Sequence, residues 1–66
     1  MNDAERIEAL LDLVDKDRKA DEGRGSQLAI LGLATLSSKG QRPYRPTSAG
    51  WVLMGDKGRP YQPPIY

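Results

Sequence analysis

The chain has 66 residues with no Cys and no His, and its formal net charge is +1. Disulfide scaffolding and the usual zinc ligand sets are therefore excluded, so stability must come from one compact apolar core, from self-association or from a partner. No stretch has the pattern of a signal peptide or approaches the ~20 apolar residues that span a bilayer, which predicts a soluble, cytoplasmic protein.

The small net charge hides two opposite halves. Residues 1–22 hold eight acidic and four basic side chains, whereas residues 23–66 hold six basic side chains and one acidic side chain. Opposite halves can attract one another within the fold, or head to tail between copies. The basic half could equally face phosphates or an acidic protein.

The first segment predicts an amphipathic helix from about 3 to 19. Asn2 followed by Glu5 has the spacing of a capping box at a helix start. Leu10 widens the main apolar stripe and Leu13 lies off it; the stripe itself has a 3-4-3 spacing and consists of Ala4, Ile7, Leu11 and Val14. Lys16, Arg18 and Lys19 fall in the predicted last turn, where the helix dipole favours cations. Such a broad apolar face predicts packing against more than one element, or a helix–helix dimer seam.

The second segment leaves two alternatives open. Residues 19–25, KADEGRG, are polar and predict a loop, after which Ser26 could cap a second helix. The apolar run that follows is either one buried helix over 26–38, with Gly40 just beyond its end, or a helix over 26–31 that stops at Gly32 before a strand. Periodicity alone does not separate the two for so short a run.

All five prolines lie after residue 40. Pro43 and Pro46 predict extended backbone over 42–47, as an edge strand or a loop. Thr47 could then cap a short helix over 48–54. The alternative makes 51–54 a strand that turns through 55–58 and pairs with 59–62.

These elements predict a small α+β protein. We expect a single domain over 1–58, with an extended or hairpin region over 41–58, followed by a Pro-rich arm over 59–66 that resembles a polyproline-type tail. The N-terminal helix and a second short helix would pack on a two- or three-strand antiparallel sheet.

Residues 28–54 resemble the second half of winged-helix transcription regulators. The matching features are the end of a recognition helix, a Gly-Leu strand opening, a polar wing tip, an R-x-Y-R strand and a Thr-x-x-Gly helix start, at 28–31, 32–33, 37–41, 42–45 and 47–50. Such domains place two further helices between the first helix and the strand, where residues 20–31 have room for one. The resemblance therefore implies a truncated winged-helix domain, completed by dimerisation, with nucleic-acid contacts at Arg24, Gln27, Lys39, Arg42 and Arg45.

We expect no enzymatic activity, cofactor, metal or small-molecule substrate, because the chain lacks His and Cys and its acids crowd one predicted helix face. Cations interleaved with aromatics in the C-terminal half predict a macromolecular contact surface. Its residues would be Arg42, Tyr44, Arg45, Arg59 and Tyr61, with Ile65 and Tyr66 at the tip of the arm. A structural alternative lets the two Arg-Pro-Tyr segments, at 42–44 and 59–61, pack on Trp51 and complete a core.

The leading hypothesis is a small regulatory or inhibitory protein that binds a protein partner or itself, of a size typical of bacterial and phage accessory proteins. A truncated winged-helix DNA-binding regulator is the first alternative. A small structural subunit anchored by its C-terminal arm is the second, through insertion of that arm into a groove of another chain.

Overall fold

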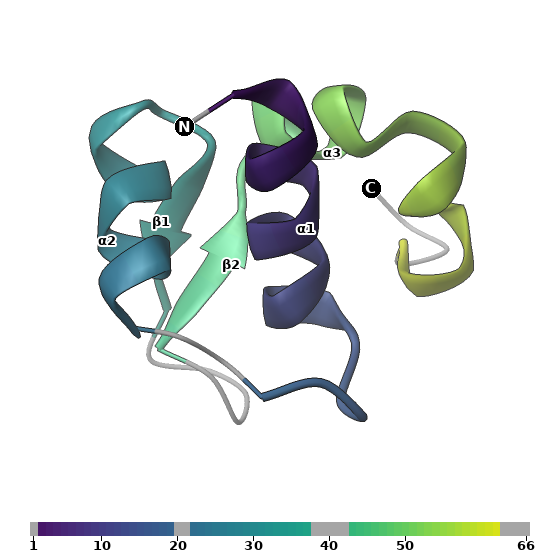
Figure 1. The fold of residues 1–66 in the computed structure, drawn as a ribbon, viewed down its shortest axis with the longest axis horizontal. Coiled ribbons are helices and arrows are strands. Elements are labelled where there is room, and N and C mark those ends of the chain that lie inside the picture. The colour runs from purple at the N-terminus through teal and green to yellow at the C-terminus, as the bar shows by residue number, and fades with distance from the viewer. Residues whose placement is uncertain (1, 20–21, 38–42, 63–66) are drawn as a thin grey trace.

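The described part of the chain folds as three short helices packed with a two-stranded antiparallel sheet, which confirms the predicted mixed α+β class (Figure 1). The computed structural model describes residues 2–19, 22–37 and 43–62. In chain order, the elements are α1 (Asp3–Val14), α2 (Glu22–Ile30), β1 (Ala34–Leu36), β2 (Tyr44–Pro46) and α3 (Ser48–Met54), followed by two 3-10 turns, Gly55–Lys57 and Arg59–Tyr61.

Helix α1 begins as predicted and ends earlier than predicted. The Asn2 side chain accepts a hydrogen bond from the Glu5 backbone N–H at 2.8 Å and caps the helix. The helix ends at Val14 instead of residue 19, because Asp15 starts a turn: its side chain accepts from the Asp17 N–H and its carbonyl accepts from the Arg18 N–H, both at 3.0 Å. The basic residues therefore lie beyond the helix, and their assignment to its last turn is wrong.

Helix α2 begins at Glu22, so the prediction of a loop over 19–25 with a cap at Ser26 is wrong for its second half. Glycine is required at position 25 because the helix backbone packs directly against the ring of Tyr44: a Cβ at this position would lie 2.7 Å from Cδ2 of that ring. The helix stops at Ile30 and Gly32 follows with φ +77°. The shorter of the two predicted alternatives is therefore correct, and the helix over 26–38 is wrong.

A Schellman motif explains why α2 stops there. The Leu33 N–H donates to the Leu28 carbonyl at 2.9 Å, and the Gly32 N–H donates to the Ala29 carbonyl at 3.0 Å. This pattern of bonds requires a left-handed residue after the helix, which is the conformation that glycine adopts most readily. The chain is thereby redirected into β1.

The sheet pairs Thr35 with Arg45 at its centre. Ala34 and its partner Pro46 are buried on the face that α1 and α2 cover, whereas Thr35 and Arg45 are exposed on the opposite face (Figure 1). The predicted extended segment at 42–47 is therefore a strand over 44–46, and its proline lies on a strand of a two-stranded sheet, where both strands are edges.

Helix α3 follows β2 directly and is capped as predicted. The Thr47 side chain accepts from the Gly50 N–H at 3.3 Å and donates to the Gly32 carbonyl at 2.7 Å, so one hydroxyl ties the helix start to the end of the α2 turn. The alternative of a strand over 51–54 paired with 59–62 is wrong. Residues 51–54 belong to α3, and the two segments after them, Gly55–Lys57 and Arg59–Tyr61, form 3-10 turns.

The core lies between α1 and the other elements. Leu10 and Leu28 have no exposed surface, and the other buried hydrophobic residues are Ala9, Leu11, Leu13, Ala34 and Met54. The apolar face of α1 is thus turned from the predicted stripe: Leu13 is buried and Ala4 is exposed. Because α1 contacts α2, β2 and α3, the prediction that its broad face packs on more than one element is confirmed.

Candidate functional site

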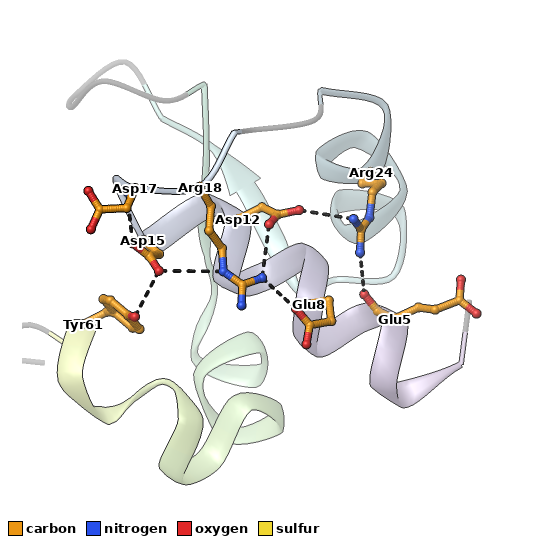
Figure 2. A network of polar contacts seen from close by, with 8 residues as sticks. All are labelled: Glu5, Glu8, Asp12, Asp15, Asp17, Arg18, Arg24 and Tyr61. Atoms are coloured by element: carbon orange, nitrogen blue, oxygen red, sulfur yellow. Dashed lines mark hydrogen bonds and ion pairs between the residues drawn. The ribbon is translucent and has the colours of Figure 1, made fainter.

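The polar face of α1 holds a network of charged side chains, which we call the carboxylate network (Figure 2). Arg18 folds back from the turn after α1, and its Nη1 lies 2.6 Å from a Glu8 carboxylate oxygen and 3.4 Å from one of Asp12. Its Nε lies 3.7 Å from a carboxylate oxygen of Asp15. Two carboxylates of α1 and that of Asp15, directly after the helix, are thus joined by a single guanidinium.

Arg24 extends this network to α2. Its Nη1 lies 3.2 Å from the second oxygen of Asp12, and its Nη2 donates to the backbone carbonyl of Glu5 at 3.1 Å (Figure 2). Asp12 is only 15% exposed, so it accepts from both arginines in a partly desolvated position. The attraction between the acidic and basic halves of the chain, one of the predicted possibilities, therefore operates within the fold at this pair.

The C-terminal segment joins the same network through Tyr61. The Tyr61 hydroxyl donates to Asp15 at 3.1 Å, across 46 residues of sequence (Figure 2). The second Arg-Pro-Tyr segment is therefore hydrogen-bonded to the turn after α1 through its tyrosine.

The network shifts the pKa values of Glu8, Arg18 and Tyr61 away from neutrality. The hydrogen bond from Arg18, together with its positive charge, lowers the pKa of Glu8, and the same hydrogen bond raises the pKa of Arg18. The hydrogen bond to Asp15 raises the pKa of the Tyr61 hydroxyl. Each group is thereby fixed in its usual state at neutral pH. Such shifts are those expected when a carboxylate, a guanidinium and a hydroxyl each have a hydrogen-bonded partner.

A groove lies beside α3, and we call it the tryptophan groove. Its volume is about 340 Å³, and its lining residues are Ser48, Trp51, Val52, Gly55, Asp56, Arg59 and Gln62. Val52 is 80% exposed although it lies in the middle of a helix. Arg59 Nε lies 3.4 Å from Asp56, but both side chains are largely exposed, and such pairs contribute little to stability. The groove therefore presents an aromatic wall, an uncovered aliphatic side chain and a displaceable cation.

A second hollow lies between α1 and α2, and we call it the α2 hollow. Its volume is about 240 Å³, and it is lined by Arg6, Gln27, Ile30 and Leu31. Ile30 is 83% exposed and Leu31 is 45% exposed. The Nε of Arg6 is buried and has no hydrogen-bond partner among the described residues, which ordinarily costs about 1–3 kcal/mol.

The predicted partner-binding residues do not form one described surface. Tyr44 is half-buried against Gly25, Arg45 lies on the open face of the sheet, and Arg59 lines the tryptophan groove. Tyr61 is 39% exposed and bonded to Asp15. Arg42, Ile65 and Tyr66 lie outside the described residues.

The predicted nucleic-acid contacts are also divided. Arg24 is engaged in the carboxylate network, Gln27 lines the α2 hollow, and Arg45 lies on the opposite face of the sheet. Lys39 and Arg42 lie outside the described residues.

The sequence interpretation missed the exposed aliphatic residues Ile30, Leu31 and Val52, and it missed Arg6 beside them. A signal was present: the run from 28 to 36 is apolar on nearly every side of a helix, which is more than a single core contact can bury. Trp51, on which the structural alternative packed the two Arg-Pro-Tyr segments, is half-buried against the core and also lines a groove.

The described residues hold no group of three or more His, Cys, Asp or Glu side chains that could bind a metal ion. No helix within those residues is both long enough and apolar enough to cross a membrane.

Comparison of the chain with models of protein families, with curated proteins and with solved structures found no match. The function of this chain therefore has to be inferred from its own surfaces.

Proposed function

We propose that this chain is a small non-catalytic protein that regulates or inhibits a protein partner by binding it through the tryptophan groove. The observation that carries the proposal is the exposure of Val52, 80%, in a groove whose other walls are Trp51 and Arg59. Tryptophan and arginine are the side chains that most often dominate the binding energy of protein interfaces.

The energetics of the groove favour a macromolecular partner. Val52 gains from burial, since its side chain is left in water by the fold, at about 25 cal/mol per Å² of apolar surface covered. Arg59 can leave Asp56 for a partner acceptor at little cost, because the exposed pair is solvated and screened. Neither step requires the fold to open.

The test compares proteins captured by immobilised wild-type chain, by Val52→Glu and by Leu36→Glu. The last variant is the matched control, because Leu36 is also a highly exposed aliphatic residue, at 71%, and is not among the lining residues of the groove. We expect one host protein to be retained by wild type and by Leu36→Glu, and to fall about tenfold with Val52→Glu, since a buried unpaired carboxylate costs more than 1.4 kcal/mol.

Equal retention by all three chains, or no partner retained at any salt concentration, would reject the proposal. Circular dichroism of each variant checks that the fold is intact, and residues this exposed are expected to change stability by less than about 0.5 kcal/mol.

The DNA-binding alternative has one supporting feature, the exposed Arg45 on the open face of the two-stranded sheet, whose second strand leads into a Thr-capped helix. Against it, Arg24 is engaged by Asp12 and by the Glu5 carbonyl, and the exposed face of α2 ends in Ile30 and Leu31. Binding driven by phosphate contacts would be strongest at low salt, so absence of duplex binding at low ionic strength would exclude this alternative.

A further inference from the structure

A second surface lies on the side of α1 opposite to the tryptophan groove. In Figure 1, α2 and α3 flank α1 on opposite sides. The α2 hollow opens there, between Arg6 of α1 and the side chains of Gln27, Ile30 and Leu31. It combines two aliphatic side chains, one cation and one amide.

The outer face of α2 is uncharged. The exposed residues Gly23, Ser26, Gln27, Ile30 and Leu31 lie at positions i, i+3, i+4, i+7 and i+8, which share one face of a helix, and the two large aliphatic side chains lie at its C-terminal end. Small residues at the start of such a stripe allow the backbone of a second helix to approach closely. The face thus has the shape and polarity of a helix-packing surface that no described segment covers.

Arg6 gives this surface a preference for charge. Its side chain is 32% exposed, and within the described residues it forms an ion pair with Asp3, at 3.5 Å, whose carboxylate is 75% exposed. A guanidinium has five N–H donors in a fork that matches a carboxylate, and a pair with so exposed an acid is easily exchanged. Its buried Nε lacks an acceptor among the described residues, and the Arg6 side chain lines the hollow.

We propose that the α2 hollow binds an acidic amphipathic helix of a partner protein, with an aliphatic side chain between Ile30 and Leu31 and a carboxylate on Arg6. A helix suits this site because an aliphatic residue and an acidic residue three or four positions apart lie on one helix face. The proposal does not depend on the tryptophan groove, which lies on the other side of α1.

The chemistry distinguishes this partner from a nucleic acid. Phosphate binding draws on several cations that act together, whereas the hollow has one arginine beside two aliphatic side chains. A carboxylate next to an apolar anchor matches both parts of the hollow.

The experiment titrates the ¹⁵N-labelled wild-type chain with a helical peptide about four turns long, bearing leucines along one stripe and glutamates flanking it. A twin peptide with glutamine in place of every glutamate is the control. We expect amide shifts centred on residues 6, 27, 30 and 31, and binding of the twin weaker by about tenfold, because the charge-assisted hydrogen bonds to Arg6 are lost.

Variants refine the result. Arg6→Gln should remove the preference for the acidic peptide over its twin while retaining weak binding, Ile30→Ser should weaken both peptides, and Val52→Glu should change neither. The proposal is overturned if millimolar peptide shifts no amide of the hollow, if the twin binds equally well, or if a DNA duplex shifts the same amides more strongly than the acidic peptide does. The wild-type titration decides these outcomes even if a variant fails to fold.

Discussion

The polar face of α1 and the outer face of α2 flank the same small core and differ in what they leave for a partner. On α1, charged side chains are bonded to one another: Arg18 joins three carboxylates, and Arg24 and Tyr61 attach α2 and the C-terminal segment. On α2, Ile30 and Leu31 are exposed beside an arginine whose Nε has no partner among the described residues. In this chain, the charged side chains of α1 are used to join elements of the fold, whereas aliphatic side chains at the end of α2 stay exposed to solvent.

That difference changes which residues are available for contact with a partner, compared with the expectation from the sequence. Arg and Tyr residues were expected to make the contacts, yet Arg24 and Tyr61 are engaged within the fold. Val52 and Ile30, which were expected to lie in ordinary secondary structure, are among the most exposed large side chains. In a chain of 66 residues the core is small, and several aliphatic side chains remain outside it.

The largest expected effect is a difference in stability between substitutions on the buried side and on the exposed side of α2. Leu28→Ala should lower the free energy of unfolding by about 2–5 kcal/mol, because it empties a fully buried position. Ile30→Ala, two residues away on the same helix, should change it by less than about 0.5 kcal/mol. Urea denaturation followed by circular dichroism measures both, and a comparable loss from the two variants would show that Ile30 is part of the core.

A smaller effect should come from the carboxylate network. Arg24→Ala should lower stability by about 1 kcal/mol, because Asp12 is partly desolvated and loses one of its two cations. Arg59→Ala is the matched control, since its pair with Asp56 is largely exposed and should be worth almost nothing. Equal stability of the two variants would contradict the assignment of Arg24 to closing the fold.

The smallest effect is a dependence on pH at the end of the chain. The pKa of Tyr61 is raised by its hydrogen bond to Asp15, so its contribution to stability is complete below the ordinary tyrosine pKa and is lost as pH rises through the folded-state pKa. An NMR titration of the Tyr61 ring should therefore show a midpoint above that of N-acetyltyrosinamide. In Asp15→Ala the midpoint should move down, and an unchanged midpoint would mean that the hydrogen bond does not persist in solution.

Local chemistry made part of this fold predictable. The caps at Asn2 and Thr47, the stop at Gly32 and the extended backbone between Pro43 and Pro46 all follow from properties of single residues. Each of these residues has few conformations that satisfy its backbone, so the sequence carries the information directly.

The remaining features depend on contacts distant in sequence. The α1 helix ends at Val14 because Asp15 forms a turn that places Arg18 against Glu8, and helix periodicity holds no record of that return. From the sequence, the two glycines of α2 predict a loop. The structure places Gly25 against the ring of Tyr44, nineteen residues later, where there is no room for a side chain. The grooves were not predicted for the same reason. Whether an aliphatic residue is exposed depends on whether a segment distant in sequence packs over it.

The most direct test of the proposed function is photo-crosslinking from the tryptophan groove. A benzophenone amino acid is placed at Val52 in one chain and at Thr35, on the open sheet face, in another, and both are irradiated with the host protein that wild type retains. Contact through the groove predicts a crosslinked adduct from position 52 and little or none from position 35. An adduct from position 35 with none from position 52 would place the partner on the sheet and contradict the account.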